Sequence, residues 1–305
     1  MSCTKQFMNW VVVLTILMLL YIPSFGICVV SVNGYHCQAM KCHHLLQVFL
    51  QKHQRINDSS SVQALQVKAA GVFKVKLKNN ETRVFKVIKK DDLNYRYEAT
   101  KIASKPFSSG HVIKIIDSHQ FSQNDEESGY TFADEFMALE MPYYPQTLQT
   151  KYSSIKMNSK TAVLVLEQMA EALNDIHSNK VIHRDIHADN IFVEDDNDED
   201  MHLILGDFSF ATEKKVFTRN EAPPEFTNPF KSDIYSLGKT IQLLTDSDDL
   251  IPSLSKLLEK MTSNDIETRP DIKEVQETVV KLNKILGRTT SLFSRVKKLY
   301  RKLLR

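Results

Sequence analysis

Residues 183–190 read His-Arg-Asp-Ile-His-Ala-Asp-Asn, and Gly-Asp-Phe follows at residues 206–208. Between the two stretches lie the apolar runs Ile-Phe-Val and Met-His-Leu-Ile-Leu, which predict a pair of short strands. Polar residues with carboxylate or amide oxygens therefore flank this pair: Asp185 and Asn190 precede it, and Asp207 follows it.

The region upstream of this stretch has a β pattern. Residues 62–90 contain Val-Phe-Lys-Val-Lys-Leu-Lys and Arg-Val-Phe-Lys-Val-Ile-Lys-Lys around Asn79-Asn80, and their alternation predicts two strands joined by a turn. A short helix is predicted over residues 92–104. Further strands are predicted over residues 111–117 and 136–141, the second of which stops at a proline.

The region downstream is predominantly helical. From residue 145 onward, apolar residues recur with helical spacing, most clearly over residues 160–178, 232–245, 253–262 and 271–286. Strands followed by helices in one chain predict an α+β fold with two lobes. The expected boundaries are 62–141 for a small β-rich lobe and 142–286 for a larger helical lobe.

The motif order resembles that of the eukaryotic protein kinases. His183-Arg184-Asp185 and Asn190 match the catalytic-loop pattern H-R-D-x-x-x-x-N, and Asp207-Phe208 matches the metal-binding D-F-G. The resemblance spans roughly residues 62–286 and implies the two-lobed protein kinase fold. Further parts of the family pattern occur in the family's order: Lys86 in a strand, Glu98 in the next helix, Pro223-Pro224-Glu225, Asp233 and Arg269.

The resemblance also implies a role for each polar residue. Lys86 would hold the α- and β-phosphates of ATP and would itself be fixed by an ion pair with Glu98. Asp207 and Asn190 would be the oxygen ligands of Mg²⁺. Asp185 would accept and orient a substrate hydroxyl, so Asp185, Lys86, Asn190 and Asp207 are the expected catalytic residues.

The expected nucleotide site departs from the family pattern in its phosphate-covering loop. The family pattern is G-x-G-x-x-G, whereas the corresponding stretch here keeps only Gly71, so Lys68, Ala69 and Ala70 would form a stiffer loop. Because glycine lets the backbone approach phosphate oxygens closely, we expect weaker binding of ATP. The adenine would receive backbone hydrogen bonds from Glu140 and Met141.

Three further positions bear on activity. Ser209 replaces the glycine of D-F-G, and His187 stands where Ser/Thr kinases usually have a lysine. Thr218 lies seven residues before Glu225, an arrangement typical of Ser/Thr kinases. The sequence therefore favours a Ser/Thr kinase that uses ATP and Mg²⁺ to phosphorylate proteins. The alternatives are a pseudokinase that serves as a nucleotide-binding scaffold, and a kinase of small molecules or glycans.

The N-terminal residues predict entry into the secretory pathway. Val11–Ile22 is an apolar run preceded by Lys5, and Ser24-Phe25-Gly26 places small residues where a signal peptidase cleaves. Residues 1–26 are therefore interpreted as a cleaved signal peptide. An apolar stretch that continues to Val32 would instead be a signal anchor, and a buried helix without a targeting role is the third reading. Either targeting reading predicts a secreted or membrane-anchored protein with a lumenal or extracellular kinase domain.

The remaining segments are a predicted linker and a basic tail. Residues 27–61 are interpreted as a helical linker. Residues 287–305 predict a basic amphipathic helix, because apolar residues recur at helical spacing among arginines and lysines. Residues 288–305 would then contact an anionic membrane surface or pack on the kinase lobe. The formal net charge of the whole chain is +2, which argues against nucleic-acid binding.

Overall fold

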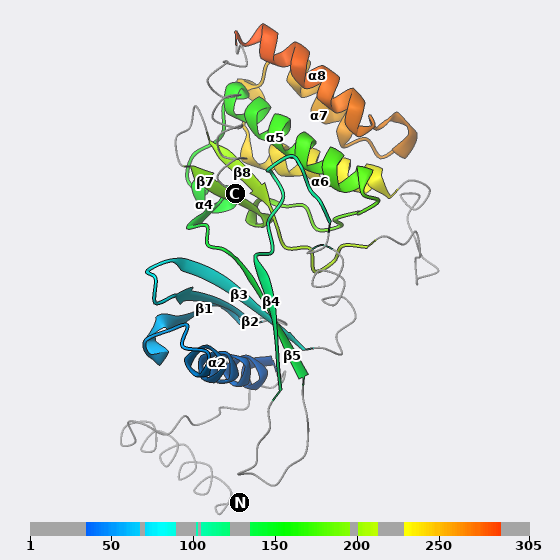
Figure 1. Ribbon diagram of the computed structural model, residues 1–305. Coiled ribbons are helices and arrows are strands. Elements are labelled where there is room, and N and C mark those ends of the chain that lie inside the picture. The colour runs from blue at the N-terminus through cyan, green and yellow to red at the C-terminus, as the bar shows by residue number, and fades with distance from the viewer. Residues whose placement is uncertain are drawn as a thin grey trace, which may run out of the picture.

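A computed structural model describes residues 35–67, 71–89, 102, 105–122, 135–195, 201–212 and 229–287. The described residues form a β-rich part at the N-terminal side and a helical part at the C-terminal side (Figure 1). The predicted α+β class, with strands first and helices after, is therefore confirmed.

The β-rich part is an antiparallel sheet of five strands in the order β1-β2-β3-β5-β4. Along β2, buried residues alternate with less buried ones, as expected of a strand with one covered face. The predicted turn between β2 and β3 is present, and Asn80 adopts a left-handed φ of 66° in it. The strands are β1 (Val62–Val67), β2 (Gly71–Lys76), β3 (Thr82–Lys89), β4 (Asp117–Ser122) and β5 (Glu135–Pro142).

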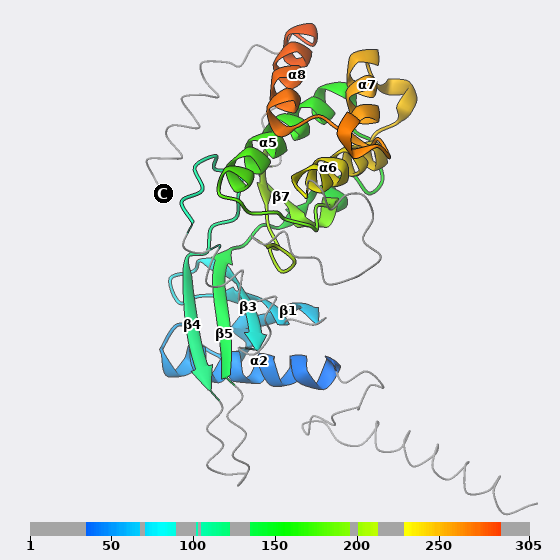
Figure 2. The same cartoon turned by 90° about the vertical axis from the view of Figure 1, so that its right-hand side faces the viewer.

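One face of this sheet is covered by helix α2, Tyr35–Lys52 (Figure 2). Cys42, Leu46 and Leu50 lie one helical turn apart and are buried in one apolar cluster with Phe73 and Phe85 of the sheet. The interpretation of residues 27–61 as a linker is therefore corrected for the part that the structure describes. Its helix belongs to the core of the β-rich lobe because it buries an apolar stripe there.

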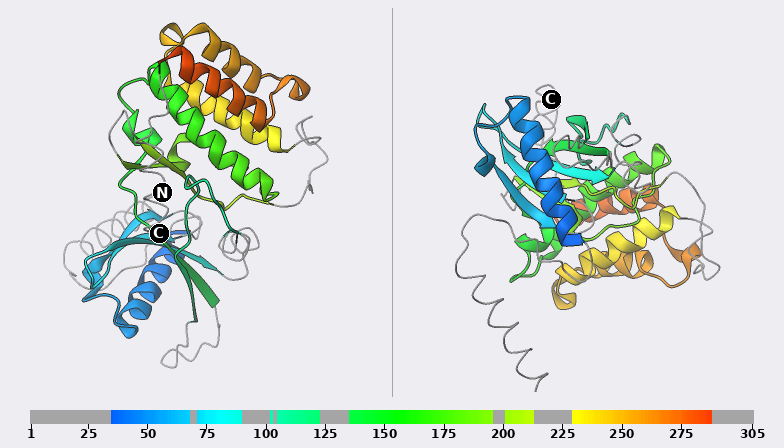
Figure 3. Two further views of the ribbon diagram at one scale, coloured as in Figure 1. Left: turned by 45° about the horizontal axis from the view of Figure 1, so that its top comes forward. Right: turned by 90° about the horizontal axis from the view of Figure 1, so that it is seen from below.

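The helical part is built around the long, largely buried helix α5, which packs against α6 and α8 (Figure 3). Two of these helices begin at polar caps: Asn158 accepts from Thr161 N before α5, and Asp271 with Glu274 forms a capping box at α8. The helices are α4 (Leu148–Lys151), α5 (Ser159–Ser178), α6 (Phe230–Leu244), α7 (Pro252–Met261) and α8 (Ile272–Ile285).

A second, small sheet joins β6 (Gln146–Thr147), β7 (Ile191–Asp195) and β8 (His202–Leu205) in that order. Strands β7 and β8 are the pair expected between the two motifs. Short 3₁₀ turns complete the described secondary structure, at Ser59–Ser61, Ala188–Asn190, Ser247–Asp249 and Ile266–Thr268.

The strand predicted over residues 111–117 is wrong, because β4 begins only at Asp117. The apolar residues that suggested a strand, Val112 and Ile113, are buried in the core of the helical lobe instead. Their segment runs beside β8: Ile113 N donates to Leu205 O, and Leu205 N donates to His111 O, both at 2.8 Å. Tertiary packing between the lobes therefore outweighs the local β pattern.

Among the residues that the structure describes, no helix combines the length and the apolar character needed to cross a membrane. The predicted signal segment, residues 1–26, and the basic tail, residues 288–305, lie outside the described residues.

Candidate active site

The loop that carries Asp185 is hydrogen-bonded to a buried carboxylate on α6. Asp233 accepts hydrogen bonds from the backbone N–H groups of His183 and Arg184, both at 2.9 Å, and its Oδ2 lies 2.9 Å from His177 Nε2. Arg184 has a left-handed φ of 69°, which costs about 1–2 kcal/mol for a residue with a side chain. The two bonds to Asp233 stabilise this strained backbone, so α6 fixes the course of the loop.

His183 connects this loop to the Gly-Asp-Phe segment. Its imidazole is fully buried, contacts the Phe208 ring in a tilted arrangement, and has Nε2 3.0 Å from the Gly206 carbonyl oxygen. Burial lowers the pKa of His183 and outweighs the nearby charges of Asp233, Asp207 and Asp185, which would raise it. Asp185 N donates to Nδ1, so Nε2 carries the proton and donates to Gly206. His183 is thus a structural residue.

Asp185 and Asn190 lie together at the end of this loop. The Asn190 amide nitrogen donates to the Asp185 carbonyl oxygen at 2.8 Å and to its carboxylate Oδ2 at 3.1 Å. With its nitrogen used in this way, buried Asn190 presents the amide oxygen Oδ1 as its remaining polar atom. His187 approaches from the exposed side, with Nε2 3.6 Å from Asp185 Oδ2 and Nδ1 3.7 Å from Asp189 Oδ2.

Lys86 and Asp207 meet across the two lobes. The Lys86 ammonium, on β3, donates to Asp207 Oδ1 at 2.7 Å and to Ser209 Oγ at 2.6 Å. Burial alone would raise the pKa of Asp207, but the charge of Lys86 and the hydrogen bonds from Lys86 and Ser209 lower it to about 2. Asp207 is therefore ionised at neutral pH. The structure thus places Lys86 and Asp207, two of the residues expected to be catalytic, in direct contact. The partner that was predicted for Lys86, Glu98, lies outside the described residues.

Gly71 and Met141, two of the residues expected at the nucleotide, line different faces of the sheet. Met141 is buried in the same core as the helical lobe. A Cβ atom at Gly71 would lie 2.5 Å from the Phe73 ring and 3.4 Å from Cys42 Cβ on α2. Close packing on the α2 face, opposite Lys86, is therefore sufficient to require glycine at this position.

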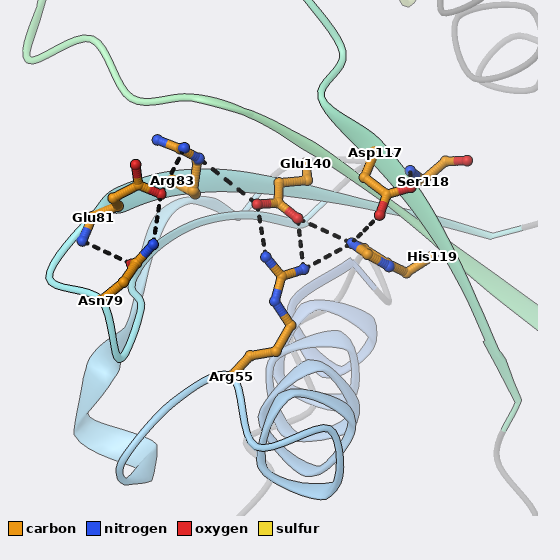
Figure 4. A network of polar contacts seen from close by, with 8 residues as sticks. All are labelled: Arg55, Asn79, Glu81, Arg83, Asp117, Ser118, His119 and Glu140. Carbon is orange, nitrogen blue, oxygen red and sulfur yellow. Dashed lines mark hydrogen bonds and ion pairs between the residues drawn. The ribbon is translucent and has the colours of Figure 1, made fainter.

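The side chain of Glu140 also lies on the α2 face, in a polar network that the sequence did not suggest (Figure 4). Arg55, just after α2, donates to both carboxylate oxygens of Glu140, at 2.6 and 2.9 Å. His119 Nε2 lies 3.0 Å from Glu140 Oε2. Burial would raise the pKa of Glu140, but the contacts with His119 and Arg55 lower it to about 2. The backbone carbonyl oxygen of Glu140 accepts a hydrogen bond from Ile116 N at 2.8 Å. One backbone group of the residue expected to contact adenine is therefore bonded within the protein.

Replacing Arg55 with alanine is expected to lower the free energy of unfolding by about 2 kcal/mol, because it leaves the buried Glu140 carboxylate without its bidentate partner. The expected loss of stability is smaller than for a fully buried pair, because Arg55 is partly exposed and His119 still contacts the carboxylate. Urea titration of the wild type and the variant at pH 7 would measure the difference.

Two controls separate the ion pair from lost packing. In a Glu140→Gln background, Arg55→Ala is expected to cost well under half as much. Glu140 has a pKa lowered from 4.5 to about 2, so its stabilisation is complete above pH 4.5 and is lost as the pH falls toward 2. The cost of Arg55→Ala should therefore shrink between pH 7 and pH 3. An equal cost in both backgrounds would assign the effect to packing alone.

The protein combines a small antiparallel sheet with a helical lobe. A lysine–aspartate pair joins the two parts, and an aspartate–asparagine pair lies in the helical part. These features define the class of two-lobed phosphotransferases that bind a nucleotide between their lobes. Residues 68–291 match the protein kinase domain family. The chain belongs to this family, and the resemblance predicted from its motifs is confirmed.

Curated relatives agree with this assignment. Serine/threonine-protein kinase WNG2 of Toxoplasma gondii is 30% identical over 46% of this chain and 29% of its own length. Probable serine/threonine-protein kinase zyg-1 of Caenorhabditis elegans is 27% identical over 39% of this chain and 20% of its own length. A Wee1-like protein kinase of Arabidopsis thaliana is 22% identical over 64% of this chain and 46% of its own length. The chain thus spans less than a third of the first two relatives.

Proposed function

We propose that this protein is a kinase that uses Mg²⁺ to transfer the γ-phosphate of ATP to serine or threonine hydroxyls of proteins. The observation that carries the proposal is the convergence of two pairs from distant parts of the chain. Lys86 and Asp207 are 2.7 Å apart, and Asn190 bonds both the backbone and the carboxylate of Asp185. These are the charges that phosphoryl transfer requires.

Each residue has a distinct task in this proposal. Lys86 binds the α- and β-phosphates with its ammonium group. Asp185 orients the substrate hydroxyl and accepts its proton, because its carboxylate is held by Asn190 at the edge of the site. His187 lies beside Asp185 and donates a hydrogen bond to the transferred phosphate.

Asp207 and Asn190 fit a divalent cation. Hydrogen bonds from Lys86 and Ser209 reach Asp207 Oδ1, and no described residue donates to Asp207 Oδ2 or to Asn190 Oδ1. A carboxylate oxygen and an amide oxygen are the ligands that Mg²⁺ prefers. When bound, Mg²⁺ neutralises part of the phosphate charge.

Protein hydroxyls as the substrate are supported by two observations. Two relatives, WNG2 and zyg-1, are named a serine/threonine-protein kinase and a probable serine/threonine-protein kinase. Thr218 also has the register of Ser/Thr kinases before Glu225, although both residues lie outside the described part of the chain.

The second candidate function is a pseudokinase that binds a nucleotide without transferring phosphate. The missing glycines of the phosphate-covering loop favour it, in which only Gly71 follows Lys68, Ala69 and Ala70, and so does His187 in place of a lysine. Purified full-length protein, γ-labelled ATP and a library of serine- and threonine-containing peptides separate the two functions. Magnesium-dependent ATP binding with label transfer supports the kinase, whereas binding without transfer supports the scaffold.

The N-terminal segment leads to a localisation proposal with its own prediction. Expressed with its native N-terminus in eukaryotic cells, the protein is expected to enter the secretory pathway, because Val11–Ile22 has the apolar length of a signal sequence. If the segment is cleaved, mass spectrometry of the mature protein should find an N-terminus close to Ile27. If it is retained as an anchor, the kinase domain should resist added protease in sealed microsomes. A cytosolic protein with Met1 intact would contradict both forms of this proposal.

Membrane contact through residues 288–305 remains a proposal on the same basis. If the tail supplies the contact, its deletion should release the mature protein from vesicles that contain anionic lipid. If an N-terminal anchor supplies the contact, the deletion should leave the protein bound.

A further inference from the structure

Ser209 follows Phe208 directly and lies between two proposed site residues. The residue is 5% exposed, and its hydroxyl both donates and accepts a hydrogen bond. Ser209 Oγ accepts a hydrogen bond from Lys86 Nζ at 2.6 Å and donates one to Asp207 Oδ1. A glycine at this position would offer neither contact, so the hydroxyl is a feature of this chain's own site.

The contacts at Asp207 are unevenly divided between its two carboxylate oxygens. Oδ1 receives Lys86 Nζ at 2.7 Å, Ser209 N at 3.3 Å and the Ser209 hydroxyl. Within the described ranges no donor reaches Oδ2. Three donors on one oxygen fix the rotation of the carboxylate and leave Oδ2 available for a cation.

We propose that Ser209 is a positioning residue that holds the Asp207 carboxylate so that Oδ2 can bind the divalent cation accompanying the nucleotide. The inference rests on the proposed role of Asp207 as a metal ligand and deepens it. Asp207 has a left-handed φ of 59°, and the bond from Ser209 N closes a turn around its side chain. The hydroxyl adds a second bond from the same residue to the same oxygen.

The need for this second bond follows from the double task of Lys86. In the described structure Lys86 donates to Asp207, and in the proposed reaction its ammonium group binds phosphate oxygens. As Lys86 turns toward the phosphates, its bond to Asp207 weakens. The Ser209 hydroxyl does not depend on the nucleotide, so it keeps Oδ1 occupied and the carboxylate oriented.

The test measures how much magnesium is needed for nucleotide binding. Full-length wild type, Ser209→Ala and Ser209→Gly are titrated with MgCl₂ at a fixed concentration of a fluorescent, non-hydrolysable ATP analogue. Loss of a hydrogen bond to a charged group corresponds to about a tenfold change in an equilibrium constant. We expect the half-saturating magnesium concentration to rise about tenfold in both variants, with binding of the analogue in EDTA unchanged.

Ser159 provides a matched control. It is also buried, at 7% exposure, and its hydroxyl bridges Asp249 O and Ile251 N, both at 2.9 Å, in the helical lobe. Ser159→Ala removes a bridging hydroxyl of the same kind far from Asp207. It is expected to lower the midpoint of thermal unfolding without changing the magnesium requirement.

Three outcomes would overturn the inference. The first is an unchanged magnesium requirement in whichever of Ser209→Ala and Ser209→Gly is folded. The second is an equal loss of affinity with and without magnesium, which assigns Ser209 a structural role only. The third is wild-type binding that does not depend on magnesium, which also removes the proposed role of Asp207. Magnesium-dependent binding without phosphate transfer contradicts the kinase proposal alone and leaves the role of Ser209 intact.

Discussion

Replacing Asp185 with alanine is expected to lower kcat by about a thousandfold while the affinity for MgATP changes less than about threefold. Asn190 donates to the Asp185 backbone oxygen at 2.8 Å and to its carboxylate at 3.1 Å, and in the proposed reaction this carboxylate contacts the substrate hydroxyl rather than the nucleotide. Its removal therefore affects the chemical step and not binding. Single-turnover transfer of labelled phosphate and calorimetric titration with MgATP measure the two effects separately.

Asp189 is the matched control for this substitution. It belongs to the same loop, is largely exposed, and its carboxylate lies 3.7 Å from His187 Nδ1. Asp189→Ala is expected to keep kcat within about threefold of the wild type, since an exposed contact of this kind contributes little. If Asp185→Ala retained wild-type kcat, or if Asp189→Ala lost as much activity, Asp185 would not be the catalytic base.

Three of the four proposed catalytic residues could be predicted from the sequence because they lie close together along the chain. Asp185 and Asn190 lie within one loop, and Asp207 follows a pair of strands that the apolar runs indicate. The contact between Lys86 and Asp207 joins residues 121 positions apart. The resemblance to a family assigned both residues to one site, but it predicted Glu98 and not Asp207 as the partner of Lys86. No periodicity in a single sequence specifies such a contact.

The network behind β5 could not be predicted in this way. Arg55 and Glu140 are 85 residues apart, and each resembles an ordinary surface charge when it is read alone. Their pairing depends on α2 covering the sheet face opposite Lys86. The spacing of Cys42, Leu46 and Leu50 was a usable signal for that packing, because three apolar residues one turn apart form a stripe.

The error at residues 111–117 has a related cause. An apolar, β-branched run is compatible with any buried extended segment, whether or not it pairs as a strand. Val112 and Ile113 run beside Leu205 and contribute to the helical lobe's core. This segment leads directly into β4 of the sheet and is hydrogen-bonded to β8, the strand that precedes Asp207. The packing of this segment against the helical lobe replaces the predicted strand, and the same packing helps to position Asp207.

Asp207→Ala is expected to weaken magnesium-dependent ATP binding by at least about a hundredfold, since even partners of metal ligands typically contribute ten- to a hundredfold to affinity. The substitution also removes the carboxylate paired with buried Lys86, so thermal unfolding of the free protein must be followed in parallel.

Asp207→Asn keeps the shape of the side chain and one oxygen but not the charge. It is expected to remain folded and still to lose most of the magnesium dependence, because the pKa of about 2 shows that Asp207 carries its charge at neutral pH. Calorimetric titration with ATP in magnesium and in EDTA distinguishes the loss of a metal ligand from a general loss of the site. Magnesium-dependent binding that survives in both variants would mean that other residues hold the cation, and it would leave Asp185 as a base without the proposed metal beside it.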